Sequence, residues 1–321
     1  MEKTPKVSVL IPTYNYAYCL DEAVQSVLDQ GFQDFELIII DDCSRDSTDE
    51  VVEKYLSDPR VSYYKNPVNL GLVGNWNKCL SYAKGEYIKF LCADDKFRPD
   101  LLEKFVLVME QYPNVSLVVC NKSMFGKSFV TVELPLQYLH PGKEIIYHTL
   151  NTKGWLGEPT CVMFRKSNLH LGMFKPGMVW LPDWEMWIRQ LTAGDCYIIP
   201  EPIAYVRNHV QQLTKKVVKQ FTHYFEEYEL CKAIRENNGY NIDKSGIDMN
   251  KVVKRRAAKC AKAMYKLVPH LHKKKERALF FKALKIAIAE RVLFTPFVDW
   301  VSGNNRRQTI LTQKETVPVK I

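Results

Sequence analysis

Two short apolar segments of this chain each end in a pair of adjacent aspartates. One reads FELIIIDD at residues 35–42, and the other reads YIKFLCADD at residues 87–95. Segments of this length that are rich in β-branched and aromatic residues, and that stop at turn residues, predict buried strands. In open α/β sheets, ligands bind outside the carboxyl ends of the strands, so each acid pair is a candidate for ligand binding.

Strand and helix patterns alternate over the first hundred residues. Strand patterns also cover residues 7–12 and 61–65, and apolar positions recur at helical spacing over residues 18–29 and 73–83. Residues 44–48 resemble the capping segment of a further helix. This order predicts an α/β fold with a mostly parallel, doubly wound, Rossmann-like sheet.

The second acid pair has two interpretations. Adjacent carboxylates repel each other, so a fold keeps them together where a cation lies between them, and hard oxygen ligands suit Mg²⁺ or Mn²⁺. Alternatively, Asp94 or Asp95 caps a helix that begins at Pro99. If both acid pairs open on one crevice, they would suit a nucleoside diphosphate, because its phosphates need a cation and its uracil or thymine ring has an N–H to donate.

Other common sites are not indicated by the sequence. The turn after the first strand, PTYNYAY, contains no glycine, which argues against a dinucleotide-binding fold, and no GxxxxGK[ST] motif occurs. The nine cysteines are scattered without CxxC spacing, which argues against a disulfide framework or a zinc site and fits a reducing cytosol. With no apolar signal segment and no apolar run of about 18 residues, we expect neither export by that route nor a membrane span.

Four motifs together resemble a known family. VSVLIPTYN, FELIIIDDCSRDST, NLGLVGNWNKCLSYAKGEYIKFLCADD and DWEMWIRQL occur in this order, within roughly residues 5–215. They are similar to the family 2 nucleotide-sugar glycosyltransferases, which have the SpsA-like GT-A fold. The resemblance implies metal-dependent transfer of a sugar from a nucleoside diphosphate, with UDP favoured, to an acceptor hydroxyl, with inversion at the anomeric carbon.

The resemblance assigns the first two strand ends to the nucleoside. Pro12 and Tyr14 would border the base, with Tyr14 stacking on it. Asp42 would accept a hydrogen bond from the ring N–H, with Asp41 as its neighbour at the strand end.

The later positions are assigned to the diphosphate and its metal ion. Asp95 would bind Mn²⁺ or Mg²⁺, and Asp94 would face the ribose or sugar of the donor. Many family members carry a further Asp where this chain has Cys92. Asn77 would lie next to the donor, unless it is an ordinary helix-surface residue. His209 would approach the metal or the diphosphate, unless it is a hydrogen-bonded surface group.

Asp183, at the start of DWEMWIRQL, is the expected general base. Inverting transfer needs one carboxylate to take the proton of the attacking hydroxyl. Pro182 stands where the family commonly has an acidic residue, and Glu185 is the reserve candidate. Trp184 and Trp187 would be core residues or would stack on sugar rings.

The middle of the chain is harder to interpret. Strand-like runs at residues 129–132 and 144–147 lie among loops, and a further strand pattern covers residues 160–165. By elimination, we assign residues 121–156 to the acceptor, a glycan or lipid-linked glycan.

Positive charge is concentrated at the end of the chain. Residues 244–321 contain 19 Lys and Arg against 5 Asp and Glu, a net charge of +14, which leaves −5 for residues 1–243. We expect a catalytic domain at residues 1–215 and a helical, basic region at residues 216–321. Amphipathic helices beside basic charge favour binding to an anionic membrane surface.

Other roles of the basic region stay open. Nucleic acid is a rival ligand, but no nucleic-acid-binding motif is present, so we expect none. A helical bundle packed on the catalytic domain is the structural alternative.

These observations together predict an enzyme of cell-surface polysaccharide or lipid-linked glycan synthesis. It would work in the cytoplasm, at the inner face of the plasma membrane, in an oligomeric state that the sequence leaves open. The first alternative is a nucleotidyltransferase, which should carry a basic, Gly-rich loop after the first strand. The second is a sugar-nucleotide-binding module without activity, against which Asp183 and the two acid pairs argue.

Overall fold

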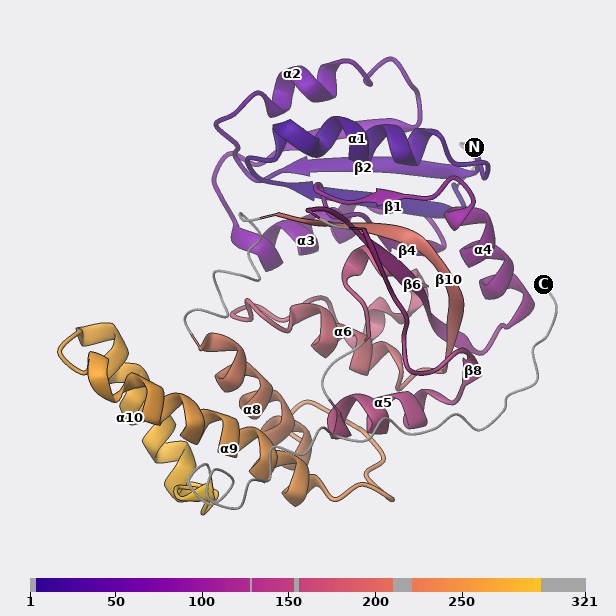
Figure 1. Cartoon of the computed structure of the whole chain (residues 1–321). Helices are drawn as coiled ribbons and strands as arrows, with labels where there is room; N and C mark the ends of the chain where they lie inside the picture. Colours follow the sequence, from indigo (N-terminus) through magenta and orange to yellow (C-terminus); the bar gives the residue numbers. More distant parts are fainter. Residues whose placement is uncertain (1–3, 128, 153–155, 210–220, 296–321) are drawn as a thin grey trace. The chain divides into compact units, whose positions relative to one another are not determined.

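A computed structural model describes residues 4–127, 129–152, 156–209 and 221–295 of the chain (Figure 1). The chain divides into two compact units. Of the described residues, the first unit comprises 4–127, 129–149 and 156–209, and the second comprises 150–152 and 221–295. The predicted domain boundary at residues 215 and 216 lies outside the described residues.

One mixed sheet forms the centre of the first unit, with the strand order β3-β2-β1-β4-β9-β6-β10-β5. Its strands are β1 (Val7–Thr13), β2 (Phe35–Asp41), β3 (Val61–Lys65), β4 (Tyr87–Phe90), β5 (Lys96–Phe97), β6 (Val115–Gly126), β9 (Val162–Arg165) and β10 (Asp195–Asn208). Two short strands, β7 (Val130–Val132) and β8 (Tyr138–His140), pair with β6 and β10. The first four strands pair in parallel, as do β6 and β10, whereas β9 is antiparallel to both of its neighbours.

The helices of this unit are α1 (Ala17–Leu28), α2 (Thr48–Glu53), α3 (Gly71–Tyr82), α4 (Leu101–Gln111), α5 (Gly142–Asn151, whose last two residues belong to the second unit) and α6 (Pro182–Gln190). Figure 1 shows α1 and α3 on opposite sides of strands β1 and β2. Each helix buries one apolar face, as its spacing predicts. The predicted α/β fold with a mostly parallel, doubly wound sheet is confirmed.

One local expectation was wrong, and one of the two interpretations of the second acid pair is excluded. Residues 144–147 are not strand-like but lie inside helix α5, because Ile145, Ile146 and Leu150 are spaced to bury one helical face. Neither Asp94 nor Asp95 caps a helix at Pro99: strand β5 follows the acid pair, and α4 begins only at Leu101.

The second unit is helical, as predicted. It contains α8 (Thr222–Arg235), α9 (Met249–Leu267) and α10 (Lys274–Ala289), with the 3-10 turn η3 (Val268–His270) between the last two. The buried carboxylate of Glu290 accepts hydrogen bonds from Tyr228 on α8 at 3.1 Å and from Arg235 at 2.8 and 3.0 Å. Among the described helices, none combines the length and the apolar character that a bilayer crossing requires.

Candidate active site

The two acid pairs lie at the same edge of the sheet. Strand β1 lies between β2 and β4, and all three run in parallel. Neighbouring strands are about 4.8 Å apart, so the ends of β2 and β4 are separated by about 10 Å. This spacing is compatible with one ligand that reaches both strand ends.

Side chains of the first pair, Asp41 and Asp42, are engaged inside the fold. The fully buried carboxylate of Asp41 accepts hydrogen bonds from the Ser44 N–H at 3.0 and 3.2 Å. Asp42 accepts from the N–H groups of Leu70 and Gly71, at 2.7 and 2.9 Å, where α3 begins. A carboxylate at a helix N-terminus is favourable because of the helix dipole. Both residues therefore have a structural task, and their predicted contact with a base stays a prediction.

Asp95, in the second pair, is buried between two elements that are distant in sequence. Its carboxylate accepts a hydrogen bond from the Thr160 hydroxyl at 2.6 Å and from the Arg207 N–H at 2.9 Å. Burial and the neighbouring charge of Asp94 raise the pKa of Asp95 well above that of an ordinary Asp. A cation beside these two carboxylates would offset both effects.

Asp94 is paired with His209, which follows β10. The Nε2 atom of His209 lies 2.8 Å from Oδ2 of Asp94, and its Nδ1 atom lies 3.4 Å from the Tyr18 hydroxyl. The Arg207 guanidinium donates a hydrogen bond to the backbone oxygen of Asp94 at 2.9 Å. The structure therefore brings together the two predicted metal-site residues, Asp95 and His209, around Asp94.

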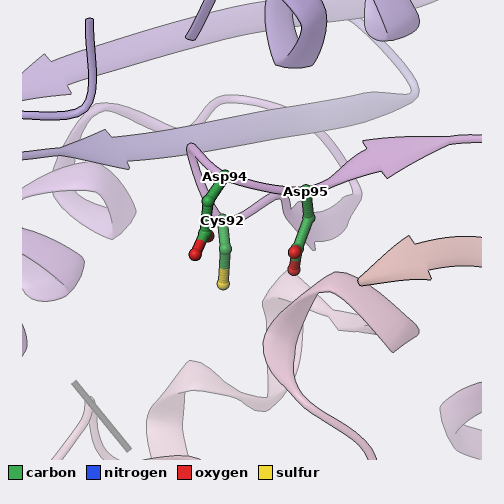
Figure 2. A group of neighbouring side chains, drawn as sticks. All are labelled: Cys92, Asp94 and Asp95. Atoms are coloured by element: carbon green, nitrogen blue, oxygen red, sulfur yellow. The ribbon is translucent and has the colours of Figure 1, made fainter. Parts of the chain in front are cut away.

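Cys92 completes a cluster with the acid pair. Its sulfur and one carboxylate oxygen from each of Asp94 and Asp95 lie within 4.8 Å of one another (Figure 2). These separations fit one divalent cation, and the two carboxylates supply the hard oxygen donors that Mn²⁺ and Mg²⁺ prefer. The residues at the carboxyl end of β4 thus fit the metal that the sequence predicts.

Asp183 lies in the first turn of α6, partly buried. Its carboxylate accepts a hydrogen bond from the Trp184 N–H at 2.8 Å. Burial raises the pKa of Asp183 to about 7, with a further increase from Glu158, although the Trp184 N–H and Lys122 act in the opposite direction. A base with a pKa near 7 is suited to accept a proton under neutral conditions.

Glu185, the reserve candidate, is fully buried. Its carboxylate pairs with Arg189 at 2.7 Å and with Lys175 at 3.2 Å. These pairings give Glu185 a structural role and leave Asp183 as the better candidate for the base. Trp187 is also fully buried, which agrees with its interpretation as a core residue.

The remaining predicted residues have different surroundings. Tyr14, at the end of β1, is 44% exposed and free to stack on a ligand ring, and Pro12 is half-buried. Asn77 uses both ends of its amide on the backbone of Phe174, at 2.9 and 3.0 Å. Because these bonds give Asn77 a structural role, we leave it out of the proposed site.

Two features near the site were missed by the sequence analysis. Lys89 is fully buried within β4 and donates hydrogen bonds to the backbone oxygens of Pro159 and Thr160, at 3.3 and 2.5 Å. Lys122 forms an ion pair with Glu158 at 2.5 Å. Lys89 could have been noticed in the sequence, because it is a charged residue within the apolar run YIKFL. The pairing of Lys122 with Glu158 has no such signal, because no local pattern links the two positions.

The strand order of the sheet, with an acidic cluster at the carboxyl end of β4, agrees with a glycosyltransferase of GT-A-like fold. The sequence model described as glycosyl transferase family 2 matches residues 8–172, and the chain belongs to this family. The nucleotidyltransferase and the inactive module are therefore set aside.

Individual relatives and solved structures agree with this assignment. The chain is 30% identical over 232 residues to the putative teichuronic acid biosynthesis glycosyltransferase TuaG of Bacillus subtilis (strain 168), covering 70% of this chain and 89% of TuaG. The fold is similar to that of S. aureus TarS 1-349 in complex with UDP-GlcNAc, with a TM-score of 0.69, 18% identity and coverage of 94% and 88% of the two chains. The mannosyltransferase PcManGT from Pyrobaculum calidifontis, in complex with GDP-Man and Mn²⁺, has a TM-score of 0.56, 18% identity and coverage of 91% and 87%.

Proposed function

We propose that the chain transfers a sugar from a nucleoside diphosphate, with uridine as the nucleoside, to a hydroxyl of a cell-surface glycan or its lipid-linked precursor. The observation that carries this proposal is the cluster of Cys92, Asp94 and Asp95 at the carboxyl end of β4, with His209 hydrogen-bonded to Asp94, in a chain of family 2. The complexes of TarS with UDP-GlcNAc and of PcManGT with GDP-Man and Mn²⁺ support a nucleotide-sugar donor and a metal. The name of TuaG supports a polysaccharide product.

In this proposal each residue has one task. Asp95, with Asp94 and His209 beside it, would hold Mn²⁺ or Mg²⁺. When bound, the metal would supply positive charge that neutralises the diphosphate leaving group. Tyr14 would stack on the base, and Asp42 would accept from its N–H.

Asp183 would carry out the proton transfer. It accepts the proton of the acceptor hydroxyl while the hydroxyl oxygen forms a bond to the anomeric carbon. The bond between that carbon and the diphosphate oxygen breaks on the opposite face, and its electron pair leaves with the diphosphate. A single displacement of this kind inverts the anomeric configuration.

A panel of nucleotide sugars tests the function. We expect one UDP-sugar, with Mn²⁺, to raise the melting temperature by several degrees, because a ligand at about 100 times its Kd adds about 2.7 kcal/mol of stability. The panel should contain UDP-glucose, UDP-galactose, UDP-GlcNAc and GDP-mannose, each with Mn²⁺ and with a chelator. Stabilisation by GDP-mannose alone would contradict the uridine assignment, and no stabilisation by any member would contradict the function.

We also propose that the second unit binds an anionic membrane surface. On α10, Phe281 and Ile288 are 53% and 59% exposed and lie seven residues apart, with exposed Lys285 between them on the same face. Apolar side chains beside lysines are typical of helices that lie in the interface of an anionic bilayer.

Vesicle sedimentation tests the membrane proposal. We expect the full chain to sediment with vesicles that contain phosphatidylglycerol and to stay in solution with pure phosphatidylcholine. A Phe281→Ser, Ile288→Ser double variant should lose this binding, since two exposed apolar anchors are removed. Leu107→Ser, at a 45% exposed position on α4, is the matched control and should bind like the unchanged chain. Equal sedimentation of the double variant would refute the proposal.

A further inference from the structure

The segment Gly157–Cys161, called here the 157–161 turn, contacts the elements that hold both candidate catalytic carboxylates. From this turn, the Thr160 hydroxyl donates to Asp95 at 2.6 Å. On the other side, the Trp187 indole N–H donates to the Gly157 backbone oxygen at 3.3 Å. Asp183 and Trp187 are four residues apart on α6 and therefore lie on the same helical face. The turn thus lies between Asp95 and the face of α6 that bears Asp183.

Packing fixes the position of this turn. The buried ammonium of Lys89 donates hydrogen bonds to the Pro159 and Thr160 backbone oxygens. A Cβ atom added at Gly157 would lie 2.8 Å from the Cβ atom of Cys161, which leaves no room for a larger residue. Because Gly157, Pro159 and Thr160 are held by hydrogen bonds, the Glu158 side chain projects from a fixed part of the backbone.

Glu158 is held by Lys122 of β6. The Lys122 ammonium lies 2.5 Å from both carboxylate oxygens of Glu158. The Glu158 side chain is 41% exposed and that of Lys122 is 18% exposed, so the carboxylate remains accessible. Ion pairs with a partly exposed partner contribute little to stability, because water screens the attraction. Stability alone therefore gives a weak reason for placing this pair between two catalytic carboxylates.

We propose that Glu158, oriented by Lys122, binds hydroxyl groups of the transferred sugar and helps to select the donor. This inference rests on the proposed function. In an inverting displacement, the sugar lies between the diphosphate near Asp95 and the acceptor hydroxyl near Asp183, where the 157–161 turn lies. An ionised carboxylate has about four acceptor positions, so Glu158 can take hydrogen bonds from two neighbouring sugar hydroxyls while it keeps Lys122.

A purely structural role for Glu158 gives a different expectation. If the Glu158–Lys122 pair only supported the turn, its loss would disturb Thr160 and Asp95. Binding of the nucleoside diphosphate and of the nucleotide sugar would then weaken together. If Glu158 instead contacts the sugar, its replacement should weaken the binding of the nucleotide sugar and leave the binding of the nucleoside diphosphate unchanged.

The experiment compares UDP with a UDP-sugar on the full chain, by calorimetric titration in the presence of Mn²⁺. The UDP-sugar is the member of the panel above that stabilises the unchanged chain most. We expect Glu158→Gln to weaken UDP-sugar binding by about tenfold or more, because hydrogen bonds to a charged acceptor are lost. The affinity for UDP should stay within about twofold.

Glu86→Gln is the matched control. Glu86 also pairs with a lysine, Lys6, at 2.6 Å, and its side chain is 52% exposed. It directly precedes β4, at the opposite end of the strand from the acid pair. This variant should bind both ligands like the unchanged chain.

A second variant keeps the inference testable if Glu158→Gln folds poorly. Lys122→Met removes the partner that orients Glu158, and it should also weaken UDP-sugar binding more than UDP binding. Parallel losses for UDP and UDP-sugar, or no loss for either ligand, would overturn the sugar-binding role. If the unchanged chain binds neither ligand, the proposed function and this inference fail together.

Discussion

Replacement of Asp95 by Asn is expected to lower sugar transfer by about 10³-fold and to remove the stabilisation of the protein by Mn²⁺. A cation that neutralises a leaving diphosphate contributes several kcal/mol to the transition state, and each 1.4 kcal/mol corresponds to about tenfold in rate. The variant should fold, because Asp95 is buried beside Asp94 and a neutral amide removes their mutual repulsion. The Thr160 hydroxyl can rotate and either donate to the new amide or accept from it.

Two readouts separate the metal role from a general loss of structure. The melting temperature without Mn²⁺ should stay the same or rise in Asp95→Asn, while the increase caused by Mn²⁺ should disappear. Asp49→Asn, at a side chain that is 56% exposed on α2, is the control for loss of one negative charge. If the unchanged chain still transfers sugar at its full rate after complete chelation, Asp95 has no metal role.

The first half of the sheet could be predicted because its signals are local. Strand and helix periods in residues 7–91 are set by side chains that lie close in sequence, and the carboxyl ends of parallel strands meet at one edge. The sequence analysis could therefore treat a shared crevice for the two acid pairs as a possibility, which their position at one edge of the sheet supports. The reversed direction of β9 and the 14 residues of β10 depend on distant partners and were not predicted.

The same sequence pattern has different surroundings at the two strand ends. The Asp42 carboxylate accepts hydrogen bonds from the Asn66 side-chain amide and from the backbone N–H groups of Leu70 and Gly71, where α3 begins. The side chains of Asp94 and Asp95 instead contact His209, the Thr160 hydroxyl and the backbone N–H of Arg207. Both segments have the same pattern, an apolar run followed by two aspartates. This pattern alone therefore does not show which acid pair is bonded to the start of a helix.

The residues around Asp95 show why the rest of the site escaped prediction. Thr160 and Arg207 bind its carboxylate from positions 65 and 112 residues away. The ion pair between Lys122 and Glu158 likewise joins β6 to a turn 36 residues later. Pairing rules for helices and strands apply to near neighbours, so contacts of this kind appear only when the chain is folded.

Replacement of Asp183 by Asn is expected to lower kcat by about 10²–10⁴-fold while the KM for the donor stays nearly unchanged. A positioned general base contributes about this factor, and an amide cannot accept the proton. Steady-state kinetics at saturating acceptor, with donor binding measured separately, would check this split. Near-normal transfer by the variant would show that another group is the base.

The pH dependence gives an independent test of this base. Because burial raises the pKa of Asp183 to about 7, the carboxylate is ionised and active above pH 7 and protonated below it. We expect kcat/KM to fall by about tenfold per pH unit below 7, instead of below the value of an ordinary Asp near 4. The residual activity of Asp183→Asn should lack this acid limb.

Stability should change in the opposite direction to activity. The folded-state pKa of Asp183 lies above its unfolded value of 3.8, so the ionised carboxylate is less favourable in the folded chain. This cost is absent below pH 4, develops between pH 4 and 7, and is fully present above pH 7. Asp183→Asn should therefore raise the melting temperature at pH 8 and leave it unchanged near pH 4.

Glu185→Gln provides the contrast, because it weakens the pairing with Arg189 and should lower stability while it keeps the acid limb at pH 7. A variant at residue 183 that loses both activity and stability at pH 8 would instead indicate a structural role for this carboxylate.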